Sequence, residues 1–306
     1  VIEQGMGKKF KFLSYWFSIA GLVGCLSLLQ ANQLTQIMSD YLVKSFDVEQ
    51  SFNLNLIIGI IIAILVSSVI FGGLSRIAEV ASKIVPFMVM VYLLSGLFIV
   101  LSNASLIPAI FSNIFTSAFN GSSVAGGFAG TAIVISQGFR RAAFSNEAGA
   151  GSASIAHSAV KTKYAASEGL VALLEPFIDT VVICTMTALV IIIFNFSGAF
   201  MYGGEGGVMI DGVLYEGAGI TAKAFDQYIP GSEYFLTTAV VLFAVSTMIS
   251  WSYYGLQSWM FIFGKTKWSD LTYKFLFLSF IVIGAAGDMS SVWGFSDAMI
   301  LALVFP

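Results

Sequence analysis

Long runs of apolar residues, separated by short polar stretches, make up most of the chain. A helix of about 20 apolar residues crosses the hydrocarbon core of a bilayer, and most of these runs reach that length. They cover residues 13–41, 54–70, 84–101, 170–194, 235–263, 275–286 and 292–306. We therefore predict an all-α polytopic membrane protein.

The stretch from residue 106 to residue 160 has a different pattern, in which short apolar pieces alternate with glycines. The glycines stand at positions 121, 126, 127, 130, 138, 149 and 151. Glycine weakens a helix interior and permits backbone angles that other residues avoid. We predict a broken helix here, with unwound chain near residues 121–130 between helical pieces at 106–119 and 130–141.

The composition agrees with a lipid environment and narrows the functional classes. Hydrophobic residues make up 58% of the 306 positions and charged residues 10%, whereas soluble domains have about a quarter charged. The mean hydropathy is +0.90. A net charge of −3 without a basic run gives no basis for nucleic acid as a partner. Two distant cysteines and one histidine, His157, support neither a disulfide framework nor a zinc site.

The distribution of positive charge predicts the orientation, because cytoplasmic loops carry an excess of Lys and Arg. With the N-terminus inside, 12 of the 14 Lys and Arg residues fall on the inner side, and only Lys44 and Lys223 fall outside. The acidic stretch 197–233 is then an extracellular loop, with a turn near 203–207 and an amphipathic helix over 219–228. We expect one transmembrane domain over residues 1–306 that includes this loop.

The predicted helix break suits ligand binding. At such a break, freed N–H groups can hold a carboxylate and freed C=O groups can hold Na⁺. In residues 125–131, Gly130 permits unwound backbone, Phe128 can cover a ligand and Thr131 offers a hydroxyl. The alternative is a seam of small residues at which two helices pack closely.

A group of amides interrupts the apolar run 13–41. Gln30 and Gln33 are three residues apart and share a helix face, whereas Asn32 points elsewhere. Hydrogen bonds between helices explain many such amides in membranes. The functional interpretation is contact of the two glutamines with a polar ligand.

Hydroxyl groups gather on the apolar run 235–263. Ser246, Thr247 and Ser250 can place oxygens at one level of the membrane, and Trp251 adds an aromatic wall one turn later. A hard cation prefers oxygen ligands. Alternatively, these hydroxyls bond back to carbonyl groups of their own helix, as Ser and Thr commonly do.

The segment 140–149 is too polar for a lipid-facing surface. It contains Arg140, Arg141, Asn146 and Glu147 between apolar pieces. We interpret it either as a solvated inner loop or as a gate at the inner mouth, with Arg141 and Glu147 bonded to helix ends or to each other. Asp179 in the run 170–194 is costly in a bilayer, so it needs a partner or caps a helix.

Together these residues resemble the alanine/glycine:cation symporter family, also called sodium:alanine symporters. The motifs that carry the resemblance are Gln-Ala-Asn-Gln at 30–33, Gly-Gly-Phe-Ala-Gly at 126–130, Phe-Ser-Asn-Glu-Ala-Gly at 144–149, Phe-Ile-Asp-Thr at 177–180 and Trp-Ser-Tyr-Tyr-Gly at 251–255. The resemblance extends over essentially the whole chain. The chain departs from the family pattern at Ala142, where a glycine is usual, and at Ala150, where a leucine is usual.

The resemblance implies a leucine-transporter-like fold of two inverted five-helix repeats, with the substrate at two broken helices. It also implies that this chain begins at the third core helix and lacks the first two and the final one. By the resemblance, substrate contacts are expected at Phe128, Gly130, Thr131, Trp251, Gln30 and Gln33, and cation contacts at Ser246, Thr247 and the carbonyl of Phe243.

Three functional classes compete for these observations. A channel predicts charged rings or a selectivity filter, and an enzyme needs a nucleophile with its base or a set of metal ligands. The sequence has neither set of features. We therefore expect a secondary transporter of the plasma membrane, without a cofactor, that imports alanine or glycine with Na⁺ or H⁺. Another amino-acid transporter of the same fold is the first alternative, and a channel is the second.

The predicted orientation can be tested by labelling single cysteines from each side of the membrane. Cysteines that replace Glu205, Asp211 or Glu216 should react with an impermeant reagent from outside. Cysteines that replace Lys161 or Lys265 should react only from inside. Labelling from the opposite side would contradict the orientation.

Overall fold

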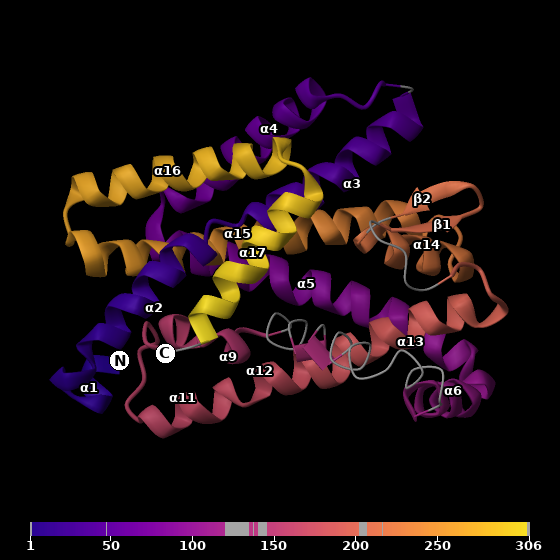
Figure 1. Cartoon of the computed structure of the whole chain (residues 1–306), viewed down its shortest axis with the longest axis horizontal. Helices are drawn as coiled ribbons and strands as arrows, with labels where there is room; N and C mark the ends of the chain where they lie inside the picture. The colour runs from indigo at the N-terminus through magenta and orange to yellow at the C-terminus, as the bar shows by residue number, and fades with distance from the viewer. Residues whose placement is uncertain are drawn as a thin grey trace. The chain divides into compact units, whose positions relative to one another are not determined.

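The computed structural model describes residues 2–46, 48–119, 135–136, 138–139, 146–201, 207–215 and 217–304. Within them the chain is helical apart from one small two-stranded sheet and the connecting turns (Figure 1). The elements are α1 Ile2–Met6, η1 Lys8–Phe10, α2 Lys11–Gly24, α3 Leu28–Phe46, α4 Phe52–Ile70, α5 Gly73–Ser102, η2 Ala104–Leu106, α6 Ile107–Phe119, α9 Glu147–Ala150, α10 Ala153–His157, α11 Ala165–Ala172, α12 Leu174–Pro176, η3 Phe177–Cys184, α13 Thr185–Phe194, η4 Asn195–Ser197, β1 Val208–Ile210, β2 Val213–Tyr215, α14 Ala218–Tyr228, α15 Ser232–Phe263, α16 Lys267–Ala286 and α17 Met289–Val304.

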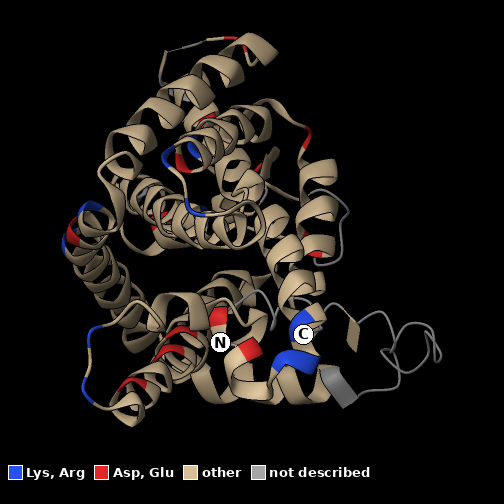
Figure 2. Ribbon diagram, turned by 90° about the vertical axis from the view of Figure 1, so that its left-hand side faces the viewer, with Lys and Arg blue, Asp and Glu red and all other residues tan. Residues whose placement is uncertain are grey.

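Six helical stretches in the described residues are long and apolar enough to cross a membrane, which confirms the predicted fold class. They are Lys8–Val43, Phe52–Ile70, Gly73–Ser102, Ala165–Ser197, Tyr234–Phe263 and Lys267–Ala286. Charged residues are sparse along these helices (Figure 2). Much of the apolar surface that lipid would cover is exposed, as on α4, where Ile61 is 54% and Ile64 is 64% exposed.

The chain divides into two compact units. The first consists of Val1–Val89, Ala150–Ala172 and Thr237–Pro306, and the second consists of Met90–Gly149 and Leu173–Leu236. Two long helices, α5 and α15, contribute to both units. The single transmembrane domain expected over residues 1–306 stays a prediction.

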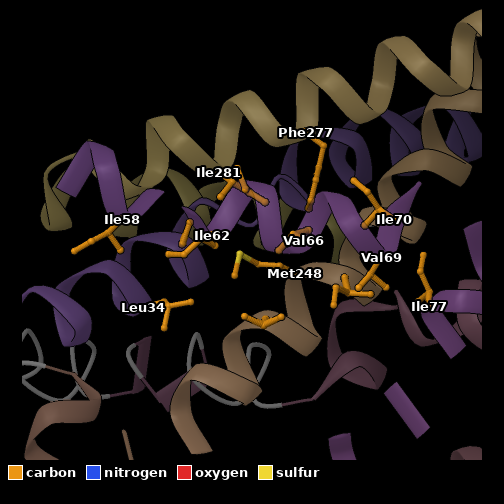
Figure 3. Close-up of a cluster of buried hydrophobic side chains, with 14 of the residues drawn as sticks. Leu34, Ile58, Ile62, Val66, Val69, Ile70, Ile77, Met248, Phe277 and Ile281 are labelled. Carbon is orange, nitrogen blue, oxygen red and sulfur yellow. The ribbon is translucent and has the colours of Figure 1, made fainter. Parts of the chain in front are cut away.

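The main core of the first unit lies where α16 packs along α4 and α3. Phe277 and Ile281 of α16 meet Ile62 and Val66 of α4, and Met248 of α15 joins the same cluster (Figure 3). In lipid such contacts stabilise mainly by close packing, because the surrounding acyl chains are equally apolar. The helices therefore need surfaces that fit closely.

Glycine makes the closest approach in this core. A Cβ atom at Gly59 of α4 would lie 2.5 Å from the Cβ of Ala285 on α16, a distance that real side chains do not tolerate. The pair is a small-residue contact of the kind that draws membrane helices together. α4 and α16 thus depend on Gly59 for their close contact.

The apolar run 13–41, predicted as one span, is two helices. α2 ends at Gly24 and α3 begins at Leu28, with Ser27 between them in the left-handed region at φ 55°. An L-residue with a side chain rarely adopts this conformation without support from its surroundings. Ser27 is 2% exposed, so buried packing rather than a local sequence signal holds the break.

The amide of Asn32 fixes the point at which α16 ends. Asn32 is 6% exposed, and its Nδ2 donates to the carbonyl oxygens of Gly284 at 2.9 Å and of Gly287 at 2.8 Å. The last carbonyls of a helix lack partners within the helix. Asn32 therefore adds a hydrogen bond to the Gly284 carbonyl, which also accepts from the backbone N–H of Gly287 at 3.3 Å, and bonds the Gly287 carbonyl in the turn after α16.

The second unit contains the loop region expected outside. β1 and β2 form a hairpin that pairs Val208 with Tyr215, and its turn residues Asp211 and Gly212 have φ values of 53° and 80°. Positive φ at both central positions is the geometry of a type I′ turn. The helix predicted over 219–228 is α14, and Lys223 on it lies 3.3 Å from Asp211.

An aromatic core supports α14 in the second unit. Phe225 of α14 is fully buried and stacks on Tyr92 of α5 with ring centroids 5.4 Å apart. The Tyr92 hydroxyl is 2.7 Å from the hydroxyl of Thr187 on α13. This region of the chain is therefore packed against membrane helices instead of forming a separate domain.

Replacing Asn32 with alanine should destabilise the protein. The change removes a donor from the buried carbonyl of Gly284 and from the half-buried carbonyl of Gly287, which costs about 1–3 kcal/mol. Thermal unfolding of the detergent-solubilised whole protein would show a lower midpoint. Asn53→Ala on the exposed surface of α4 is the matched control and should leave the midpoint unchanged. Equal midpoints for the two variants would show that Asn32 is not a structural anchor.

Candidate functional site

The expected cation ligands lie on α15 in the first unit. Ser246 is 6% exposed, and its hydroxyl donates to the carbonyl oxygen of Phe243, one turn earlier, at 3.0 Å. Thr247 is the next residue and is half-buried. The structure thus brings the hydroxyl of Ser246 and the carbonyl of Phe243 together on one side of a continuous helix. The hydrogen bond is also the back-bond that serine commonly forms in helices.

Trp251 continues this part of α15. It follows Thr247 by four residues, so the two side chains lie on the same face of the helix. Trp251 is half-buried. An indole in this position has a large apolar surface available to a small ligand beside it.

The amides Gln30, Asn32 and Gln33 of α3 differ in whether they already bond other helices. Gln33 Nε2 donates to the sulfur of Met289 at 3.2 Å, which links α3 to the start of α17. Asn32 is used at the end of α16. Gln30 is half-buried, and its side chain has no hydrogen-bond partner among the residues that the structure describes. Gln30 is therefore the amide of this group best able to bind a ligand.

The two candidate helices meet in one core. Ala31 and Leu34 of α3 belong to the same buried cluster as Val245 and Met248 of α15. Figure 3 shows Leu34 and Met248 within this cluster. The predicted site residues that the structure describes therefore come from two helices packed in a single unit.

The other half of the expected site lies outside the described residues. Phe128, Gly130 and Thr131 belong to residues 120–134, together with the predicted unwound chain at 121–130. Arg140 and Arg141 of the proposed inner gate also lie outside them. These assignments stay predictions.

The polar segment at 146–149 packs on the irregular part of the next span. Asn146 Nδ2 donates to the hydroxyl of Thr180 at 2.9 Å, and its Oδ1 accepts from the backbone N–H of Gly149 at 2.9 Å. The backbone N–H of Glu147 donates to Glu175 Oε1 at 2.9 Å. The segment is thus anchored within the second unit by side chains, and no motif in the sequence predicts the contact with Glu175.

Thr180 and Asp179 lie in η3, a π-helical segment. π-helical turns are rare and often occur at functional sites. Thr180 Oγ1 lies 3.5 Å from Asp179 Oδ2, so one hydroxyl is close to both the amide of Asn146 and a carboxylate. Asp179, expected to need a partner, is next to this polar group.

Comparison with known proteins identifies the family of the chain. The model of the sodium:alanine symporter family matches residues 1–306, which is the whole of the chain. The chain belongs to the sodium:alanine symporter family. This confirms the resemblance drawn from the sequence motifs. Members of this family are transporters and not enzymes, and the chain is a multi-pass membrane protein.

The matched relatives are named as transporters or symporters. The chain is 35% identical over 306 residues to "Uncharacterized transporter YflA" of Bacillus subtilis, covering 98% of this chain and 60% of the relative. It is 35% identical over 304 residues to "Sodium/alanine symporter AgcS" of Methanococcus maripaludis, covering 99% and 62%. A third relative, "Probable sodium/glutamine symporter GlnT" of Bacillus subtilis, is 32% identical over 251 residues, covering 81% and 49%. The chain thus spans about three fifths of the length of the first two relatives.

The names of the relatives differ in the amino acid, alanine in one and glutamine in another. Both of these names thus give an amino acid as the solute but differ in its side chain.

Proposed function

We propose that the whole protein that contains this chain imports a small neutral amino acid, alanine or glycine, with Na⁺ as the coupling ion. The observation that carries the proposal is the family match over residues 1–306. The proposed location is the plasma membrane, with the N-terminus of this chain in the cytoplasm. Coupling to H⁺ and transport of another amino acid are the alternatives.

The hydroxyl cluster of α15 supports Na⁺ coupling. Ser246 and Thr247, with the carbonyl of Phe243, offer oxygen ligands at one level of the helix, which suits a hard cation. Within the described residues, no cluster of three or more His, Cys, Asp or Glu side chains could hold a metal ion. A monovalent ion held by neutral oxygens agrees better with this chemistry than a divalent ion held by carboxylates.

The proposed substrate site combines Trp251, Gln30 and Gln33 with Phe128, Gly130 and Thr131. In this arrangement the backbone near Gly130 holds the carboxylate, and the aromatic rings of Phe128 and Trp251 limit the size of the side chain. A small side chain contributes only about 0.8 kcal/mol per methylene. Selectivity for alanine or glycine must therefore come mainly from steric exclusion of larger amino acids.

The proposal is tested by uptake into proteoliposomes that contain the whole protein. Radiolabelled alanine, glycine and glutamine are compared with an inward Na⁺ gradient, an inward H⁺ gradient and no gradient. Accumulation of alanine or glycine that requires the Na⁺ gradient supports the proposal. Accumulation driven by H⁺ alone, or of glutamine alone, would replace the proposed ion or the proposed substrate.

Trp251→Ala should weaken uptake of alanine and admit larger amino acids. The enlarged pocket gives each additional methylene of the substrate about 0.8 kcal/mol, which is about a fourfold gain in binding. Competition of labelled alanine uptake by a series of longer aliphatic amino acids measures this gain. Trp268→Ala is the matched control, because Trp268 is 79% exposed on α16. An unchanged competition profile in a folded Trp251 variant would make Trp251 a packing residue.

Thr247→Ala should chiefly raise the Na⁺ concentration that gives half-maximal uptake. Loss of one oxygen ligand should raise it about tenfold or more, while the order of preferred substrates stays the same. The measurement is alanine uptake as a function of Na⁺ concentration. Thr272→Ala on the exposed surface of α16 provides the control. A changed substrate order with an unchanged Na⁺ dependence would move Thr247 from the cation site to the substrate site.

A further inference from the structure

A pocket of about 260 Å³ lies in the first unit, apart from the proposed substrate site. It is bounded by the end of α4, the start of α5, the second half of α15 and the start of α16. Pockets for drug-sized ligands measure about 300–1,000 Å³. The size of this pocket therefore suits a small molecule or the headgroup of a larger one.

The wall of the pocket formed by α16 carries an ion pair whose lysine is buried. Lys274 is 9% exposed, and its Nζ lies 2.8 Å from Asp270 Oδ2. The ammonium group also lies 5.7 Å from the centre of the Phe71 ring. Withdrawing the Lys274 ammonium group from water carries a desolvation cost that offsets its attraction to Asp270, so such a pair is weak support for stability. Its position in a pocket points to binding.

A second ion pair in the same unit has the same sequence spacing and therefore serves as a comparison. Glu79 and Lys83 on α5 have the same separation of four residues and the same 2.8 Å distance between nitrogen and oxygen. Their side chains are 64% and 72% exposed, whereas those of Asp270 and Lys274 are 31% and 11% exposed. The spacing is thus ordinary for a helix, and the burial at the pocket is not.

The remaining lining matches a molecule with a polar end and an apolar side. Ser252 donates its hydroxyl proton to the carbonyl of Ile249 at 2.6 Å, which leaves the lone pairs of the hydroxyl as acceptors. The half-buried amide of Gln257 can both donate and accept. Ile77 and Leu256 supply the apolar surface.

The pocket follows the proposed transport site along α15. Ser252 and Tyr253 come directly after Trp251. Tyr253 and Gln257 follow Ser246 by 7 and 11 residues, which places each of them within about 20° of Ser246 around the helix axis. In the predicted orientation, this direction along α15 leads to the cytoplasm. A solute released from the proposed site would therefore move towards the level of the pocket.

We propose that this pocket binds a small zwitterion, with the oxyanion of the ligand at Lys274 and its ammonium group at Asp270. Lys274 has three N–H groups, of which one bonds Asp270, and Asp270 has a second carboxylate oxygen, so both can bind a ligand while the pair stays together. Two sources share this chemistry. One is the amino acid released after transport, which rests on the proposed function, and the other is the phosphoethanolamine headgroup of a membrane lipid.

The first arm of the test measures amino-acid binding. Radiolabelled alanine, glycine and glutamine are titrated onto the whole protein in phosphatidylcholine nanodiscs. If the amino acid is the ligand, the protein binds a second equivalent. Lys274→Met should weaken binding of that equivalent about tenfold or more, because one member of a charge pair is lost. Leu74→Trp fills the pocket from a side chain that is 43% exposed and should have the same effect without touching a charge.

The second arm measures lipid retention. The whole protein is purified from membranes that contain phosphatidylethanolamine, and bound lipid is counted by native mass spectrometry. If the headgroup is the ligand, the unmodified protein retains this lipid, whereas Lys274→Met and Leu74→Trp lose it. Lys83→Met removes the lysine of the exposed pair and should behave like the unmodified protein in both arms.

The outcomes separate this inference from the proposed function. A second equivalent of amino acid, or retained lipid, that both pocket variants lose supports the zwitterion pocket and identifies its source. No such difference in either arm overturns it, even if Na⁺-dependent alanine uptake is intact. Lipid retention lost in both variants upholds the pocket even if uptake does not depend on Na⁺.

Discussion

The first unit depends on one requirement of the hydrocarbon environment, that each buried backbone group must have a hydrogen-bond partner. The requirement is most demanding where α16 ends and the chain turns into α17. Asn32 meets it from α3 by donating to the carbonyls of Gly284 and Gly287. Gly284 makes the approach possible, since a Cβ atom there would lie 2.8 Å from the carbonyl oxygen of Leu28. The packing of α3 against α16 thus depends on the hydrogen bonds of Asn32 and on the absence of a side chain at Gly284.

Polar side chains also gather at irregular backbone that is exposed or only partly buried. At the turn before α17, hydrogen bonds from Ser290 and Ser291 hold the pKa of the Asp288 carboxyl below its usual value. In the second unit, Asn146 and Thr180 connect the segment at 146–149 to the π-helical segment η3. A polar residue in this chain is therefore not a ligand site by residue type alone. What separates a ligand from a support is whether the side chain keeps a donor or acceptor for a ligand once its hydrogen bonds to the backbone are made.

The sequence predicts the regular helices well, because their apolar runs are long. The run 54–70 is α4, and the segment 219–228 is α14. It does not predict the break at Ser27, because the positive φ there is held by tertiary packing. The predictions do not include the β-hairpin, although Asp211 and Gly212 between apolar residues are a recognised turn signal. In the sequence, Asp270 and Lys274 resemble an ordinary ion pair on a helix surface, because a spacing of four residues does not show whether the side chains are buried.

Back-bonding and cation binding need not compete at Ser246. The hydroxyl proton is directed at the carbonyl of Phe243, so the lone pairs of the oxygen are directed away from that carbonyl. A cation that approaches this oxygen would not have to break the existing bond. The helix backbone then acts as the support, because it fixes the rotamer of Ser246 before the ion arrives. The hydrogen bond to the Phe243 carbonyl, which is ordinary for a serine in a helix, would thus also orient the Ser246 hydroxyl oxygen as a ligand. Ligands from another part of the site would then complete the coordination.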